Sequence, residues 1–219
     1  MPQIFHPSAN TLSRLTLFGM AVGPLALLIV SYLLIRSPYQ TGVRVIREQP
    51  VPFSHEHHVG GLGIDCRYCH TSVETSAFAG LPPTHTCMTC HSQIWSTSPM
   101  LEPVRTSLAM KQPIVWTRVH NLPDFVYFNH AIHIQKGIGC VSCHGRVDKM
   151  PIMWKEEPLT MEWCLECHRH PERHLREKRE VFNMEWAPPV REQLEIGRDL
   201  IEREHIEVDR LTNCSVCHR

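Results

Sequence analysis

The longest apolar segment of the chain lies near its N-terminus. Residues 15–35 contain no charged side chain, and Arg14 and Arg36 flank them. A helix of this length would measure about 30 Å, which matches the hydrocarbon core of a bilayer. A cleaved signal peptide is the alternative, but its apolar region is shorter and a small-x-small cleavage site follows it. The pattern therefore predicts a retained transmembrane helix over about residues 15–35.

A second helical pattern follows the prolines at 188 and 189. Apolar residues recur at nearly helical spacing from Val190 to Leu211, among paired arginines and glutamates. Between residues 60 and 123 neither a helical nor a strand period is sustained, and prolines interrupt the chain repeatedly. We therefore expect a fold that is mainly α and irregular, in which loops connect short helices.

Charge and composition narrow the class of protein. The 219 residues include 22 basic and 22 acidic side chains, so the formal net charge is zero. A basic excess, which is typical of nucleic-acid-binding proteins, is absent from the sequence, and no nucleic-acid partner is expected. The sixteen histidines and ten cysteines are the unusual feature of the composition.

All ten cysteines fall into five copies of one motif, Cys-x-x-Cys-His. The copies begin at Cys66, Cys87, Cys140, Cys164 and Cys214. This motif is typical of c-type haem attachment, in which two thiols form thioethers and the adjacent histidine ligates the iron. Zinc ribbons and disulfide scaffolds also pair cysteines, but neither requires a histidine after every second cysteine. The sequence therefore predicts five covalently bound c-type haems.

The five motifs assign a role to fifteen side chains. The predicted thioether cysteines are Cys66, Cys69, Cys87, Cys90, Cys140, Cys143, Cys164, Cys167, Cys214 and Cys217. The predicted proximal iron ligands are His70, His91, His144, His168 and His218. Because five porphyrins would supply much of the buried apolar surface, we expect a loop-rich domain whose core is formed by the haems.

The ligand on the far side of each iron decides whether a haem can bind substrate or only pass electrons. Two segments, residues 53–58 and 128–133, share the pattern Phe-x-His-x-x-His and precede a motif with nearly the same offset. The motifs themselves repeat with a period of 74 to 77 residues. Histidines three residues apart share one side of a helix and can reach two neighbouring haems. The predicted distal ligands are His55, His58, His130 and His133.

The residues alone leave the fifth distal ligand open. His205 lies nine residues before Cys214, where the repeat places a distal histidine, and His170 follows a proximal histidine by two. A methionine could also serve, since it is a known axial ligand. The other candidates are His57, His85, His120, His174, Met150 and Met153.

Longer segments resemble a known family. Phe-x-His-x-x-His ahead of Cys-x-x-Cys-His is similar to the class III cytochromes of the c3 and c7 type, in which such pairs ligate two different haems. Much of residues 53–219 also resembles the pentahaem cytochrome c component of the bacterial alternative complex III. The matching segments are residues 61–70, 81–84, 87–95, 118–130, 145–151, 161–168 and 211–214.

This resemblance implies a protein that relays electrons and does not itself convert the substrate. Its partners would be an iron–sulfur subunit, polytopic quinol-binding subunits, and a soluble periplasmic acceptor such as a cytochrome c or a copper protein. The resemblance also favours His120 as the fifth distal ligand. A stand-alone membrane-anchored quinol dehydrogenase and a multihaem reductase of a small oxyanion are the alternatives.

The predicted organisation is an N-terminal anchor over residues 1–36, a linker over 37–52 and a pentahaem domain over 53–219. More arginines follow the apolar segment than precede it, which by the positive-inside rule argues for a cytoplasmic domain. Haem attachment takes precedence, because c-type haems are attached outside the cytoplasmic membrane. We therefore expect a single-pass protein of the inner membrane with its haem domain in the periplasm.

Overall fold

The computed structural model describes residues 4–218. Its contacts divide the chain into two compact units, Met1–Val43 and Arg44–Arg219. Residues 1–3 and 219, at the outer ends of the predicted anchor and haem domain, lie outside the described residues. The division falls inside the predicted linker over residues 37–52, so part of that segment belongs to each unit.

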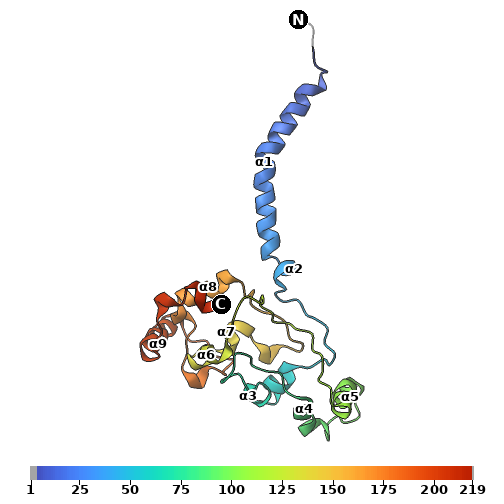
Figure 1. The fold of residues 1–219 in the computed structure, drawn as a ribbon, viewed down its shortest axis with the longest axis vertical. Helices are drawn as coiled ribbons and strands as arrows, with labels where there is room; N and C mark the ends of the chain where they lie inside the picture. The colour runs from blue at the N-terminus through green and yellow to red at the C-terminus, as the bar shows by residue number, and fades with distance from the viewer. Residues whose placement is uncertain (1–3, 219) are drawn as a thin grey trace. The chain divides into compact units, whose positions relative to one another are not determined.

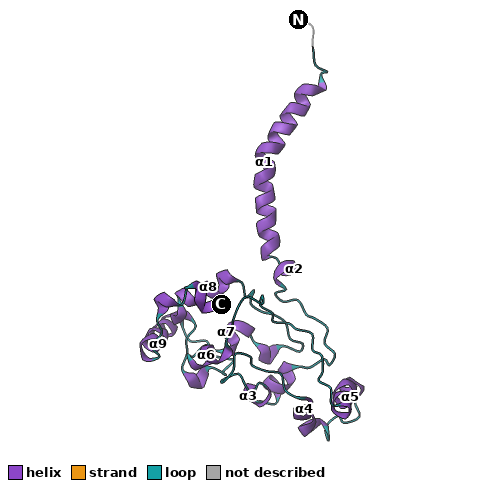
Figure 2. Ribbon diagram, viewed as in Figure 1, coloured by secondary structure: helices purple, strands orange, loops and turns teal. Residues whose placement is uncertain are grey.

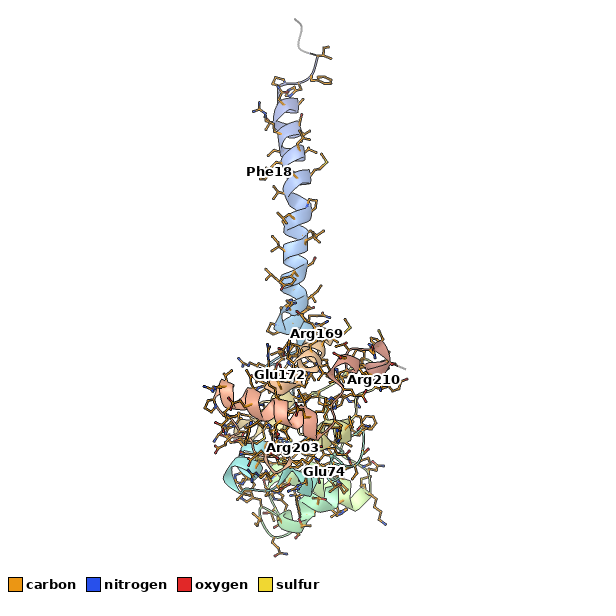
Figure 3. All side chains as sticks on the ribbon, turned by 90° about the vertical axis from the view of Figure 1, so that its left-hand side faces the viewer. Phe18, Glu74, Arg169, Glu172, Arg203 and Arg210 are labelled. Atoms are coloured by element: carbon orange, nitrogen blue, oxygen red, sulfur yellow. The ribbon has the colours of Figure 1, made fainter. Side chains whose placement is uncertain are left out.

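The first unit consists of the long helix α1 (Ser8–Arg36) and the single turn α2 (Pro38–Thr41). Helix α1 has 29 residues, none of them buried, and is long and apolar enough to cross a membrane. It bends in its middle (Figure 1), where Pro24 lies, because proline cannot donate the backbone hydrogen bond of a continuous helix. Phe18 projects from the helix without a covering neighbour (Figure 3). Such an uncovered apolar surface is suited to lipid.

The second unit contains short helices joined by loops (Figure 2). Within residues 44–218 the structure has no strand, and extended pairing is limited to one bridge between Ile138 and Leu175. The mainly α and irregular fold is therefore confirmed. The elements are η1 (Glu56–Gly61, π-helical), α3 (Cys66–Cys69), α4 (Thr84–His91), η2 (Pro99–Leu101), α5 (Glu102–Met110), α6 (His130–Gln135), α7 (Cys140–His144), η3 (Val147–Lys149), α8 (Met161–Arg169), η4 (Pro171–Arg173), η5 (Lys178–Glu180), α9 (Val190–Arg203), η6 (Val208–Arg210) and α10 (Cys214–Cys217).

The predicted C-terminal helix is present but shorter than the apolar pattern suggested. Helix α9 ends at Arg203 instead of continuing to Leu211. His205 has a φ of 50°, a left-handed conformation that cannot continue a right-handed helix. Within α9, Gly197 is buried against the backbone of Glu172, where a Cβ atom would lie 2.1 Å from the carbonyl oxygen. This close approach fixes α9 against η4.

The apolar core of the second unit is small. One cluster is centred on Val51, Leu101 and Val104, and another on Val147, Met150 and Met184. Many large apolar side chains beside the cysteine motifs remain exposed, including Leu62, Phe78, Leu81, Trp95 and Met161. Burying such surfaces would contribute about 25 cal/mol per Å². A flat apolar cofactor held at each motif would cover them.

Candidate haem-binding sites

Each Cys-x-x-Cys-His motif forms a single helical turn. In α3 and α10 the histidine backbone N–H donates to the carbonyl of the first cysteine, at 2.9 Å for His70 and 2.8 Å for His218. The turn places the two thiols on one side and directs the histidine next to them. Asp65 caps α3 by accepting from the Arg67 N–H, and Thr160 caps α8.

The ten thiols are arranged in pairs and not in a metal-binding tetrad. All ten cysteines are free. Over residues 4–218 no three His, Cys, Asp or Glu side chains are grouped to hold one metal ion. A tetrahedral zinc site would require four ligands around one centre. The donor set instead fits two thioethers and one imidazole per cofactor.

Four proximal histidines have the same hydrogen bond. In each of them Nδ1 lies within hydrogen-bonding distance of a backbone carbonyl oxygen, which can only accept, so Nδ1 carries the proton. Nε2 therefore keeps its lone pair for a metal, as in other histidine metal ligands. The pairs are His70 with Gly80 at 2.7 Å, His91 with Ile94 at 3.0 Å, His168 with Leu211 at 3.0 Å and His218 with Phe125 at 3.0 Å.

His144, the proximal histidine of the third motif, has a different partner. Its Nδ1 lies 3.3 Å from Nε2 of His120, and the two rings meet edge-on with centroids 4.4 Å apart. Burial lowers the pKa of His144 to about 3 and that of His120 to about 4. Both imidazoles are therefore neutral at physiological pH, and one nitrogen donates to the other.

The first Phe-x-His-x-x-His segment holds its two histidines around one aromatic ring. Phe53 contacts His55 edge-on at 4.9 Å and stacks on His58 at 4.4 Å, measured between ring centroids. Nδ1 of His58 donates to the carbonyl oxygen of Ser54 at 2.8 Å. The two imidazoles consequently point in different directions, as ligands of two separate haems must.

The second segment repeats this arrangement. Phe128 contacts His130 edge-on at 4.8 Å and stacks on His133 at 4.6 Å. Nδ1 of His133 donates to the carbonyl oxygen of Asn129 at 2.7 Å, and Nδ1 of His130 donates to that of Ala77 at 2.9 Å. The first copy is π-helical and the second α-helical, yet the ring geometry is the same.

Three of the predicted distal histidines face a proximal histidine at a distance that suits a shared iron. An imidazole nitrogen lies about 2 Å from a bound metal ion, and the ring centroid lies about 1 Å behind it, so two rings across one metal are about 6 Å apart. The observed centroid distances are 6.1 Å for His58 and His91, 6.3 Å for His130 and His144, and 6.2 Å for His133 and His168.

His55 lies close to His70. Burial, followed by the nearby His70 and His58, lowers the pKa of His55 to about 4. Its Nδ1 is buried and has no hydrogen-bond partner in the described part of the chain. An unsatisfied buried polar atom is costly, and an imidazole held in this way fits a ligand position. The structure therefore brings four predicted distal histidines next to four proximal ones.

The other candidates for the fifth distal ligand lie elsewhere. His170 and His174 approach the carboxylates of Glu172 and Glu166, at 3.4 and 3.5 Å. Met150 is buried in an apolar cluster, and Met153 packs against the same cluster. His57 stacks on Trp95, His85 and His205 are exposed, and the ring next to His218 is Phe125.

The thiols of different motifs approach one another in a definite order. Cys140 of the third motif donates a hydrogen bond to Cys66 of the first, which lowers the pKa of Cys66 to about 7. Other cysteines are close enough to interact electrostatically. These pairs are Cys69 with Cys87, Cys143 with Cys164 and Cys167, and Cys164 with Cys217. The motifs are thus neighbours in the order second, first, third, fourth and fifth.

Sequence reasoning missed Arg176, which supports the third motif. Only 5% of Arg176 is exposed; it donates to Ser142 Oγ at 3.1 Å, and burial lowers its pKa. Its guanidinium carbon would lie 2.3 Å from a Cβ atom at Gly139, so that position requires glycine. The signal that could have pointed to this contact is the glycine directly before Cys140.

Two comparisons with known proteins bear on these sites. A family described as cytochrome c7 and related cytochrome c matches residues 126–219. The chain is also 32% identical, over 154 residues, to a protein of Nitratidesulfovibrio vulgaris (strain Hildenborough) named "menaquinone reductase, multiheme cytochrome c subunit". That alignment covers 59% of this chain and 71% of the relative.

Proposed function

Because the chain belongs to the family of multihaem c-type cytochromes related to cytochrome c7, we propose that it is the pentahaem electron-transfer subunit of a quinone-linked membrane complex. The observation that carries this proposal is the facing of distal and proximal imidazoles about 6 Å apart. Bound haem supplies one-electron chemistry at its iron. Two protein ligands leave no coordination position for a substrate, so such haems only pass electrons.

The ten cysteines are sufficient for five haems, each held by two thioethers. The histidine contacts support a proposed pairing for four of them. In the chain order of their motifs, the pairs are His70 with His55, His91 with His58, His144 with His130 and His168 with His133. In both repeats the first histidine of the Phe-x-His-x-x-His segment serves the following motif, and the second serves the motif after it.

The contacts between motifs support a linear path for the electron. The second and fifth motifs lie at the ends, and the first, third and fourth lie between them. An electron that enters at one end would cross all five haems before it leaves. The chain's own residues contribute spacing, axial ligands and burial, which are the properties that set haem potentials. Conversion of quinone belongs to other subunits in this proposal.

Helix α1 supports membrane attachment, and the need to attach haem outside the cytoplasm supports a periplasmic haem unit. The segments that resemble the pentahaem cytochrome of alternative complex III lead us to propose that complex as the assembly. Polytopic quinol-binding subunits and an iron–sulfur subunit would be its partners in the membrane. A periplasmic cytochrome c or copper protein would accept the electrons.

The name of the bacterial relative favours a second candidate, in which the electron runs in the opposite direction. That relative is named as part of a menaquinone reductase. The same path of haems would then deliver electrons from a periplasmic donor to a menaquinone-reducing complex. The residues that hold the haems are common to both directions, so the direction depends on the potentials and on the partner complex.

Reduction by a menaquinol analogue tests the proposal. Haem absorbance is followed once with the isolated, fully matured chain and once with the detergent-solubilised native assembly. The proposal predicts reduction of the assembly alone. Rapid reduction of the isolated chain would make it a stand-alone quinol dehydrogenase. Reduction of menaquinone by the assembly, without the reverse reaction, would favour the second direction.

The oxyanion reductase alternative has its own test. A reductase needs a haem with an open coordination position and turns over its substrate. The dithionite-free reduced chain is mixed with nitrite or sulfite, and haem reoxidation is recorded. We expect no acceleration over buffer, and multiple turnovers would contradict the electron-relay proposal.

A further inference from the structure

One proximal histidine differs from the other four in the group that its Nδ1 contacts. His70, His91, His168 and His218 face backbone carbonyls at 2.7 to 3.0 Å. His144 faces the imidazole of His120 at 3.3 Å. The third motif is also the middle of the linear order, with the first motif on one side and the fourth on the other.

The hydrogen-bond roles in this pair follow from the opposite side of the His144 ring. His130 faces His144 with the two ring planes only 8° apart and the centroids 6.3 Å apart. If His144 presents Nε2 to an iron shared with His130, its proton must sit on Nδ1. Nδ1 then donates to Nε2 of His120, which accepts with its lone pair and carries its own proton on Nδ1.

This geometry separates His120 from a distal-ligand role. Distal ligation would need the same Nε2 lone pair that accepts the hydrogen bond from His144. One lone pair cannot serve both, and the edge-on contact at 4.4 Å leaves no room for an iron between the two rings. The sequence prediction of His120 as the fifth distal ligand therefore competes directly with the observed contact.

We propose that His120 is a positioning residue that accepts a hydrogen bond from His144 and thereby sets the reduction potential of the third haem. The inference rests on the proposed haem at Cys140 and Cys143. An acceptor at Nδ1 fixes the ring orientation and makes the ligand more basic, which stabilises ferric iron and lowers the potential. The contact to the imidazole acceptor, at 3.3 Å, is longer than the carbonyl contacts of the other four. The third haem is thereby tuned separately from its neighbours.

The test compares two variants of the full, haem-loaded chain, H120F and H120Q. Phenylalanine keeps a ring of similar size but provides no acceptor, while the amide oxygen of glutamine can accept from Nδ1. Potentiometric titration followed by absorbance and electron paramagnetic resonance gives the potentials and spin states. We expect no new high-spin haem in either variant, an upward shift of one potential in H120F, and a return toward the wild-type value in H120Q.

Two results would overturn the inference and leave the electron-relay proposal in place. A new high-spin haem in H120Q would show that His120 ligates iron, because glutamine does not replace an imidazole ligand. Unchanged potentials in both variants would show that the contact has no influence on the haem. A wild-type chain that carries no haem on Cys140 and Cys143 would instead refute the proposed function together with this inference. Because H120Q is conservative, it keeps the test decisive if H120F does not mature.

Discussion

His133 provides the clearest test of the paired-histidine geometry. Its ring faces His168 at 6.2 Å, and its Nδ1 is held by the carbonyl oxygen of Asn129 at 2.7 Å. In H133A the iron bound by His168 loses its sixth ligand and becomes five-coordinate. With five haems present, about one fifth of the haem should change from low-spin to high-spin and gain the ability to bind carbon monoxide. The other four haems should keep their spectra.

The assay is carbon monoxide titration of the dithionite-reduced chain, with the spectral change expressed per total haem. The matched control is I132A, because Ile132 is the neighbouring residue on α6 and its side chain is exposed. We expect one additional carbon monoxide site in H133A and none in I132A, relative to wild type. Equal carbon monoxide binding in H133A and wild type would refute the assignment of His133 as a distal ligand.

Three further predictions follow from other parts of the chain. G197A should destabilise the mature chain by about 1–3 kcal/mol in thermal unfolding, because its methyl group would overlap the Glu172 backbone; an unchanged melting temperature would contradict this packing. Hydrogen bonds from Arg146 lower the pKa of Asp148, so its stabilising contribution is present above the ordinary carboxyl pKa of about 3.9 and is lost as pH falls through the lower folded value. Acid unfolding of D148N should lose that component, and identical pH profiles would count against it. Protease added outside spheroplasts should digest the haem unit, and digestion confined to inside-out vesicles would reverse the proposed orientation.

Local patterns in the sequence were sufficient for the elements that depend on neighbouring residues. The uncharged segment predicted α1 because a membrane helix needs only length and apolar composition. The five motifs each form one helical turn, so their spacing indicated both thioether sites and the adjacent proximal ligand. The repeated Phe-x-His-x-x-His pattern likewise predicted two segments with matching ring geometry.

Contacts between distant residues could not be read from the same patterns. The hydrogen-bond acceptor of His218 is Phe125, 93 residues away, and that of His168 is Leu211. The contact of His120 with His144 and the burial of Arg176 beside Ser142 depend in the same way on how the loops cross. Spacing counts that suggest His205 as a ligand do not include its left-handed backbone, which lies just past the end of α9. These contacts carry the information on haem pairing, order and tuning.

The proposal as a whole depends on five covalently attached haems, and the intact mass of the mature wild-type chain measures this directly. We predict the mass of the polypeptide plus five haems, with no cysteine that reacts with an alkylating reagent after denaturation, because all ten would be thioethers. Fewer haem masses, accompanied by alkylated cysteines or by disulfides that appear on the same chain, would contradict it.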